Sequence, residues 1–403
     1  MGIYVDGTTH KSLRGHPLFQ QFRGFSYLCS PYKKSMTLYI FNPEHDYALA
    51  NNDPHFMAPA SATKFADDCA EFLRYLYDDE SMTIFRPYGP QQPFPSHLDG
   101  ITPWGWDPLM RHQLLEAGVD PRLLPTVEQL DRWRELAHRK IAIAGMDYLR
   151  EHCPQRHIPE SATLLTSTEE VERYIAQHGD VILKSPYSGN GRGNLYAHGE
   201  YSPTLRRQTA GVIRKQGSIL GEPLHNIVRD FAMEFHCQNG ITTFSGYSLF
   251  NTKHYGYAGN CLCSDEVIVD TLCKWISRNF LEEVKQTLIT FVNQNIAPHY
   301  DGYLGVDMFV YTDNSGKYQL NPMVEINLRM TMGMAAHILY ERYVHPDATG
   351  TMQLTYLPAP GALAAWAREQ APLQTLNGRW YSGFHALTPI HEDTQYAVTV
   401  QFI

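Results

Sequence analysis

The sequence has few of the features that mark secreted or membrane proteins. No run of about 18 apolar residues occurs among its 403 residues, so no segment is predicted to span a membrane. Residues 1–35 lack the apolar core of a signal peptide. The 7 cysteines are odd in number and include no Cys-x-x-Cys pair, which disfavours a disulfide framework or a zinc site. We therefore expect a cytoplasmic protein in a reducing compartment.

Basic residues are also fewer than acidic ones. The chain has 33 Lys and Arg against 42 Asp and Glu, which gives a formal net charge of −9. A surface that binds nucleic acid needs basic side chains to neutralise phosphates, so nucleic acid is not an expected partner. A small polyphosphate ligand is not excluded, because a local pocket and a metal ion bind it. Its binding does not depend on the electrostatic field of the protein's net charge.

An alternation of strand and helix patterns follows the first 35 residues. Strands are predicted at 37–41 and 82–85, and helices at 62–77, 107–117 and 127–137. This order predicts a small α/β module over 36–135. Residues 1–35 show no clear period. We expect the folded protein to begin near Met36, with 1–35 as a loose arm or an overcalled start.

The rest of the chain divides into a long central region, 136–345, and a short last one, 346–403. In the central region, helices are predicted at 141–151, 168–177 and 267–295, and strands at 181–184, 218–220, 231–236, 242–249, 303–311 and 318–327. From about residue 346 the chain is rich in Pro, Ala and Gly. Residues 379–386 and 396–403 have the pattern of a hairpin or of edge strands.

A glycine-rich segment follows directly after a predicted strand. Lys184 ends that strand, and the segment Ser-Pro-Tyr-Ser-Gly-Asn-Gly-Arg-Gly occupies 185–193. Glycine lets backbone N–H groups fold closely around phosphate oxygens, and the Lys184 ammonium supplies a point charge. No Gly-Lys-Ser/Thr closes the segment, so it is not a Walker A loop. By itself it fits a plain flexible hairpin loop equally well.

Two strands near the end of the central region carry acidic residues. Asp307 lies in the first, and Glu325, Asn327 and Arg329 alternate along the second. Alternation places these three on one face, where an Asp of the adjacent strand meets them. Carboxylate and amide oxygens are the ligands that Mg²⁺ prefers. The competing interpretation is a solvent-facing strand with ordinary polar residues.

Together these segments resemble the ATP-grasp family over roughly 136–345. The resemblance implies that Lys184 and the glycine-rich loop, through Ser188, Gly189, Gly191 and Gly193, cover the phosphates of ATP. It also implies that Asp307, Glu325 and Asn327 hold one or two Mg²⁺ ions, with Mn²⁺ as a substitute. Arg329 then contacts the transferred phosphoryl group. The order of these elements along the chain matches that of the family.

The resemblance assigns further nucleotide contacts. An early lysine that reaches the phosphates falls at Lys140, although a solvated lysine at a helix start explains it equally well. The strand that lays its backbone on adenine ends at Glu222. The acid that binds the ribose is Asp230, with Glu234 as the competitor. The stretch 224–229 is longer than in the tightest family versions, which leaves that choice open.

The substrate side of the site is assigned to the segment 251–260. A basic residue near the reacting carboxylate falls at Lys253, and Tyr257 and Asn260 are candidates to line this side. A surface loop without a role is an equal alternative.

At the amino end, Glu44, His45 and Asp46 follow the carboxyl end of a predicted strand, where ligands of open α/β sheets collect. Three consecutive side chains point in different directions, so a shared metal is not expected.

The resemblance implies an α/β (α+β) chain with an ATP-grasp fold. It has a Rossmann-like pre-ATP-grasp module at the N-terminal side and a small β-rich extension at the C-terminal end. The implied activity is an ATP- and Mg²⁺-dependent ligase that joins a small-molecule carboxylate to an amine. The alternatives are a small-molecule kinase and a nucleotide-binding regulator without turnover. A homodimer is left open.

Overall fold

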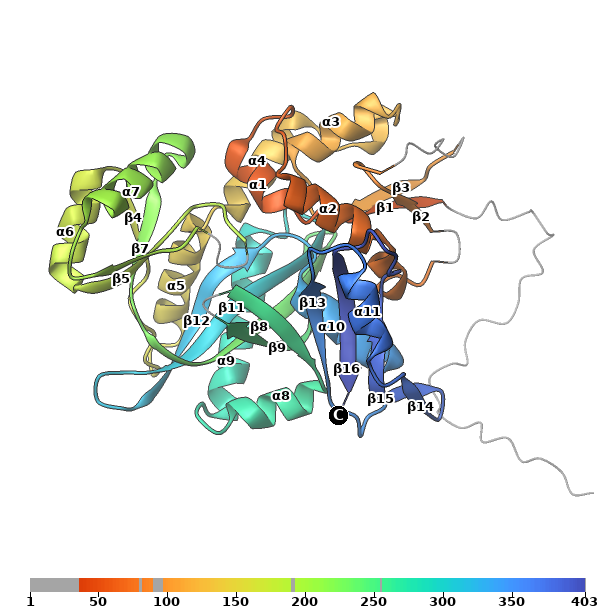
Figure 1. Cartoon of the computed structure of the whole chain (residues 1–403). Helices are drawn as coiled ribbons and strands as arrows, with labels where there is room; N and C mark the ends of the chain where they lie inside the picture. The colour runs from red at the N-terminus through yellow and green to blue at the C-terminus, as the bar shows by residue number, and fades with distance from the viewer. Residues whose placement is uncertain (1–35, 80–81, 90–96, 190–192, 254–255, 403) are drawn as a thin grey trace, which may run out of the picture. The chain divides into compact units, whose positions relative to one another are not determined.

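Three β-sheets organise the described part of the chain (Figure 1). The structure is a computed structural model that describes residues 36–79, 82–89, 97–189, 193–253 and 256–402, without the side chains of 252–257. These residues fall within one unit, Ser35–Ile403. Within the described ranges, no helix is both long and apolar enough to cross a membrane.

The first sheet is parallel and forms the expected α/β module. Its order is β2 (Thr83–Phe85), β1 (Thr37–Ile40), β3 (Gly100–Pro103). Its helical elements are α1 (His45–Asn51), α2 (Ala60–Cys69), η1 (Ala70–Tyr75), α3 (Pro108–Glu116), η2 (Pro121–Leu123) and α4 (Val127–Ala137). The helix predicted over 62–77 is shorter than expected, because the chain tightens into a 3₁₀ helix after Cys69. The short helix α1 was not predicted.

The second sheet is antiparallel and holds the start of the glycine-rich loop. Its order is β4 (Thr163–Leu165), β7 (Ile219–Pro223), β5 (Asp180–Lys184), β6 (Leu195–His198). Helices α6 (Thr168–His178) and α7 (Pro203–Gln216) share a buried core with it. Ser202 caps α7 at its start and a left-handed Gly217 ends it, so local sequence fixes both ends.

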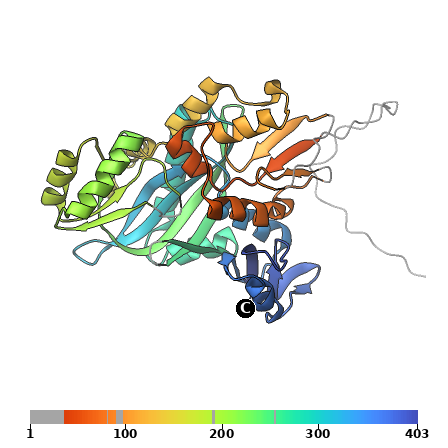
Figure 2. The same ribbon diagram turned by 45° about the horizontal axis from the view of Figure 1, so that its top comes forward.

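The third sheet has nine strands in the described part of the chain. Its order is β12 (Tyr318–Asn327), β11 (Gly302–Thr312), β8 (Asn226–Gln238), β9 (Ile241–Lys253), β10 (Gly256–Leu262), β13 (Gly350–Tyr356), β16 (Tyr396–Phe402), β15 (Arg379–Ala386), β14 (Gln374–Leu376). The C-terminal region is thus β-rich, as expected, and Figure 2 shows its dark blue strands together with α11 (Ala362–Arg368). Strands β15 and β16 pair antiparallel, but β16 also pairs with β13 and is not an edge strand.

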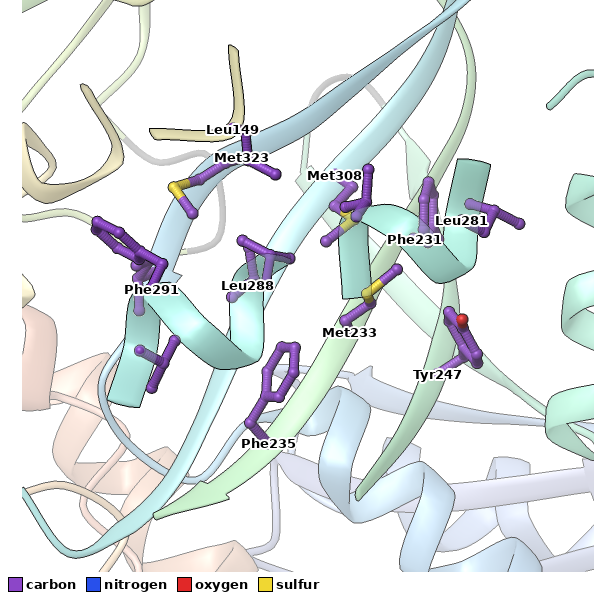
Figure 3. Close-up of a cluster of buried hydrophobic side chains, with 14 of the residues drawn as sticks. Leu149, Phe231, Met233, Phe235, Tyr247, Leu281, Leu288, Phe291, Met308 and Met323 are labelled. Atoms are coloured by element: carbon purple, nitrogen blue, oxygen red, sulfur yellow. The ribbon is translucent and has the colours of Figure 1, made fainter. Parts of the chain in front are cut away.

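One face of strands β8 and β11 packs on three helices. These are α5 (Lys140–His152), α8 (Asp265–Leu272) and α9 (Arg278–Asn295). Figure 3 shows Phe231 of β8 beside Leu281 of α9, and Phe291 of α9 beside Met323 of β12. The remaining helix, α10 (Met332–Tyr343), belongs to a second buried cluster with β13 and β16.

The single helix predicted over 267–295 is wrong. The chain forms α8, leaves the helical path after Leu272, and starts α9 at Arg278. Ser277 has an extended backbone and its hydroxyl accepts a hydrogen bond from the Phe280 N–H, so it begins a new helix. The break was hidden because apolar residues continue through it at helical spacing.

Candidate active site

The predicted metal ligands meet on the face of the third sheet opposite its helix-covered core. Asp307 lies opposite Glu325 in the register of β11 and β12. Asn327 lies two residues further along β12, so strand alternation places it on the same face. Its Nδ2 donates a hydrogen bond to Asp307 Oδ2 at 3.1 Å. Oxygen-bearing side chains from two neighbouring strands are therefore side by side.

The electrostatics of this carboxylate pair favour a cation. Burial and the neighbouring Glu325 raise the pKa of Asp307 well above its usual range. Burial also opposes ionisation of Glu325, but Arg139, the hydrogen bond from Asp307 and Lys184 together lower its pKa. The pair thus carries one negative charge more easily than two, and a divalent cation would relieve that repulsion.

The residues present fit Mg²⁺, since two carboxylates and an amide oxygen are hard donors. Among the described residues, no group of three or more His, Cys, Asp or Glu side chains is placed to hold a metal. The predicted ligand set has only two carboxylates, because its third member is Asn327. Glu44, His45 and Asp46 form no such group among these residues either.

A cavity of about 830 Å³ joins this cluster to the second sheet. Its lining includes these predicted residues: Lys184, Glu222, Asp230, Asp307, Glu325, Asn327, Arg329. They come from β5, β7, β8, β11, β12 and the turn after β12. These seven predicted residues therefore border one continuous space, whereas the predicted phosphate contacts Ser188, Gly189 and Gly193 are not among its lining residues.

Lys184 and Glu222 form a buried ion pair at one end of the cavity. Lys184 Nζ donates to Glu222 Oε2 at 2.6 Å. The antiparallel pairing of β5 with β7 sets Glu222 opposite Ile182, two residues before Lys184. The two opposite charges compensate each other's burial and lie beside the cavity.

The glycine-rich loop begins directly after Lys184. Gly193 has a φ of 94°, a left-handed conformation that glycine adopts without strain. Gly189 lies so close to the Asp46 carboxylate that a Cβ there would collide with it. Gly191 lies outside the described residues. The two described glycines are thus required by backbone geometry and by close approach.

Arg139 ties this loop to the metal cluster. Its Nη1 donates to Ser188 Oγ at 2.7 Å, and its Nη2 donates to the Ser188 carbonyl at 3.0 Å. The same guanidinium forms an ion pair with Glu325. Arg139 is only 6% exposed and lines the cavity. It immediately precedes α5, and sequence reasoning passed over it in favour of Lys140.

The side chain of Lys140 is exposed, and it does not appear among the described residues that line the cavity. Its assignment to the phosphates therefore stays a prediction, and its neighbour Arg139 is among the residues that line the cavity. Lys253 ends β9, but its side chain and that of Tyr257 lie outside the described ones. Asn260 is buried and lines the cavity.

Arg329 is held by an acid from the first module. Its Nε and Nη2 donate to the two carboxylate oxygens of Asp46 at 3.2 and 2.9 Å. Its Nη2 also donates to Asn327 Oδ1 at 3.0 Å. Burial opposes ionisation of Asp46, but the Arg329 guanidinium, with His45, lowers its pKa. The bidentate geometry fixes the direction of the guanidinium toward the cluster.

Glu234, the competitor of Asp230, lies on the same face of β8 but four residues away. At about 3.3 Å per residue, the two backbone positions are about 13 Å apart. Asp307 lies opposite Ala232, midway between them. Asp230 is therefore on the side of the cluster toward β7 and Glu222, and Glu234 is on the far side.

Sequence reasoning missed two residues that orient the charged groups, Arg139 and Asp46. Both had a weak local signal: a pair of adjacent basic residues in one case, and the carboxyl end of a strand in the other. Two other cavity residues, Ser248 and Thr331, had no signal of function in the sequence.

No protein-family model matches the chain, and no curated protein matches it in sequence. Solved structures do resemble it. Biotin carboxylase from Campylobacter jejuni, in a complex with β-γ-ATP, is 14% identical with a TM-score of 0.48, over 76% of this chain and 71% of that chain. N5-carboxyaminoimidazole synthetase from Staphylococcus aureus, complexed with ADP, is 13% identical with a TM-score of 0.48, over 91% and 93%. Pyruvate carboxylase from Rhizobium etli is 12% identical with a TM-score of 0.50, over 91% of this chain and 36% of that chain.

At such low sequence identity, a structural match supports the fold and nothing more. Of the three matches, the one with pyruvate carboxylase has the TM-score of 0.50 on which the fold assignment rests. The chain has the ATP-grasp fold, with a Rossmann-like module before it and a β-rich extension after it.

Proposed function

We propose that this protein is an ATP- and Mg²⁺-dependent ligase. It activates the carboxylate of a small molecule as an acyl phosphate and joins it to an amine. One observation carries the proposal: five residues that the sequence assigns to phosphates, metal and transferred phosphoryl group border a single cavity, namely Lys184, Asp307, Glu325, Asn327 and Arg329. Five strands contribute to the cavity lining, together with the turn directly after the last of them, which a chance arrangement of polar residues does not explain.

The nucleotide is assigned to the end of the cavity near the second sheet. There Lys184 and the loop residues Ser188, Gly189, Gly191 and Gly193 bind the phosphates, and the backbone at Glu222 lies against adenine. Asp230 is the better candidate for the ribose, because it lies on the Glu222 side of the cluster. Glu234 lies on the other side, which leaves it free for another role.

Asp307, Glu325 and Asn327 would hold one or two Mg²⁺ ions, and Mn²⁺ would serve as well. When bound, the metal neutralises charge on the β- and γ-phosphates. Arg139 keeps Glu325 ionised through their ion pair, and Asn327 orients the Asp307 carboxylate by its hydrogen bond. These residues thus prepare a negatively charged corner for a cation.

The chemistry needs positioned charges rather than a protein nucleophile. A carboxylate oxygen of the substrate attacks the γ-phosphorus, and the bond to the β-γ bridging oxygen breaks, so ADP leaves. Lys184 and Arg329 stabilise the oxygens that gain charge. Asp46 keeps the Arg329 guanidinium pointed at them. Lys253 is proposed near the reacting carboxylate.

The remaining assignments belong to the same proposal. They are the division at 36–135, 136–345 and 346–403, small-molecule carboxylate and amine partners, and a cytoplasmic location.

A substrate screen that measures phosphate release tests the proposal. Wild-type protein is incubated with ATP, Mg²⁺ and pooled carboxylates and amines, with Glu325→Gln as the blank. We expect release only when both a carboxylate and an amine are present, and a loss of at least about 100-fold in Glu325→Gln. Glu283→Gln is the matched control, since Glu283 pairs with Arg156 away from the cavity.

Equal phosphate release by Glu325→Gln and wild type would show that the metal assignment is wrong. A stable phosphorylated product formed without an amine would indicate a kinase instead. Tight ATP binding with no turnover in any mixture would indicate a nucleotide-binding regulator.

A further inference from the structure

Glu234 lies in a space that glycines keep open. In the third sheet it lies opposite Gly305 of β11 and Gly246 of β9. A Cβ on Gly305 would lie 2.7 Å from Glu234 Oε2, and one on Gly333 would collide with Oε1. Larger residues at these positions would displace the carboxylate. The absence of side chains at Gly305 and Gly333 therefore leaves the space that the Glu234 carboxylate occupies.

Two hydroxyl groups hold this carboxylate in place. Thr331 Oγ1 donates to Glu234 Oε2 at 2.8 Å, and Ser248 Oγ donates to Oε1 at 3.0 Å. Thr331 is in turn fixed as the N-cap of α10. Each oxygen thus has one donor, and no Lys or Arg in the described part of the chain forms an ion pair with Glu234. The side chain is 1% exposed, yet it lines the cavity.

The charge state of Glu234 is close to balance at neutral pH. Burial raises its pKa, and the hydrogen bonds from Thr331 and Ser248 offset part of that rise, so that the resulting pKa is about 7. The charged groups that face it are His337 of α10 and Arg329 of the turn after β12, which favour the ionised form, and Asp307 of β11. A carboxyl group with such a pKa exchanges protons readily at physiological pH.

The position of Glu234 separates it from the nucleotide. It lies beyond the Asp307–Glu325 cluster from Asp230, so it is on the side of the cluster away from the proposed ribose contact. A buried carboxylate with hydroxyl donors and no fixed cation suits a protonated amine, whose N–H groups replace the missing ion-pair partner.

We propose that Glu234, held by Ser248 and Thr331, is the acceptor site of the enzyme: it binds the primary ammonium group of the second substrate and takes a proton from it. This inference rests on the proposed ligase function and adds the class of acceptor and the residue that activates it.

The step balances without any further reactant. The ammonium R–NH₃⁺ gives one proton to the Glu234 carboxylate, and the freed nitrogen lone pair forms a bond to the acyl carbon. The bond from that carbon to the phosphate oxygen breaks, and its electron pair leaves with phosphate. The second proton of the nitrogen goes to the phosphate, which leaves as HPO₄²⁻. Glu234 then releases its proton to solvent.

Two kinds of nucleophile, one uncharged and one protonated at pH 7, distinguish this role from the first chemical step. Hydroxylamine is largely uncharged at pH 7 and traps an acyl phosphate as a hydroxamate without needing a base, whereas glycine and methylamine are protonated there. The full-length protein is assayed with ATP, Mg²⁺ and a pool of small carboxylic acids that carry no amino group, so that the added nucleophile is the acceptor. Hydroxamate formation reports activation, and amide formation with glycine or methylamine reports transfer.

For Glu234→Gln we expect hydroxamate formation within about twofold of wild type and a loss of about 100-fold in kcat/KM for the amine. Raising the pH should restore the variant, because free amine increases tenfold per pH unit below the amine pKa, whereas wild type should level off above pH 7. Glu234→Asp should recover part of the amine activity. Ser248→Ala should show a smaller loss of the same kind.

Glu44→Gln is the matched control, since Glu44 is also 1% exposed with a pKa raised to about 7 by burial. Among the described cavity residues Glu44 does not appear, so both activities should be unchanged. Amine kcat/KM within threefold of wild type in Glu234→Gln would overturn the inference. An equal loss of hydroxamate and amide would overturn it too, by placing Glu234 in activation. If wild type itself makes no hydroxamate, the ligase proposal fails and the inference fails with it.

Discussion

The two faces of strands β8 and β11 differ in almost every physical respect. On one face, Phe231, Met233 and Phe235 are fully buried against α9 (Figure 3). On the other face, Asp230 and Glu234 border a cavity together with charged groups from other elements. The same few residues thus supply core and site in alternation.

The difference teaches how a charged site is tolerated beside an apolar core. The core face is stabilised by removing apolar surface from water, which needs no particular partner. On the site face three ion pairs compensate buried charges: Lys184 with Glu222, Glu325 with Arg139, and Arg329 with Asp46. We therefore expect core substitutions to change stability, and site substitutions to change activity and its response to pH.

The largest effect should come from the core face. Phe231→Ala removes a fully buried ring and should lower the free energy of unfolding by about 3–5 kcal/mol. Asp230→Asn, the adjacent residue on the site face, should change it by less than about 1 kcal/mol and weaken ATP binding instead. Urea unfolding and ATP titration of both variants measure this. The comparison breaks down if Asp230→Asn unfolds as easily as Phe231→Ala.

A smaller effect is expected where the site depends on a partner from another element. Arg139→Ala leaves Glu325 without its cation and frees Ser188, so ATP turnover should fall about 100-fold. Lys140→Ala, one residue along, should stay within about twofold of wild type because its side chain is exposed. Phosphate release by both variants decides between them. A larger loss in Lys140→Ala would restore the lysine as the phosphate contact.

The smallest effect concerns pH. The folded-state pKa of Glu234 is about 7, above the value of 4.5 for an unperturbed glutamate, so the folded state binds the extra proton. Its contribution to stability is present below pH 4.5 and is lost as the pH rises through 7. The free energy of unfolding of Glu234→Gln, measured relative to wild type, should therefore increase by on the order of 2 kcal/mol from pH 5 to pH 8.

Urea midpoints of both proteins at the two pH values measure this gain. The destabilisation caused by Phe231→Ala should be the same at pH 5 and pH 8, since no titratable group of the core face is involved. A pH-independent difference for Glu234→Gln would mean that Glu234 is ionised throughout.

Much of the fold followed from local patterns in the sequence. Alternation placed Glu325 and Asn327 on one face of β12, and helices such as α4 and α6 begin where capping residues predict. The predicted strands at 318–327 and 379–386 have the observed bounds. These features depend on a few neighbouring residues, so a single sequence carries the information.

Other predictions failed where local patterns gave no warning. Apolar spacing continues across the break between α8 and α9. Of the two alternatives for the last two strands, the antiparallel hairpin pairing of β15 with β16 is found, but the edge position is wrong for β16 because β13 covers its other side. Whether a strand lies at an edge depends on where a distant strand docks, which alternation within the strand does not encode.

The sequence by itself determined which residues carry charge at the site, because their chemistry and spacing lie within short segments. Only the tertiary structure decided what each charge meets. Asp46 is 283 residues from Arg329, and Arg139 is 186 residues from Glu325. Glu234 similarly depends on Ser248 of the next strand and on Thr331 at the start of α10. Such pairings form when separate elements pack, and packing is set by surfaces drawn from the whole chain.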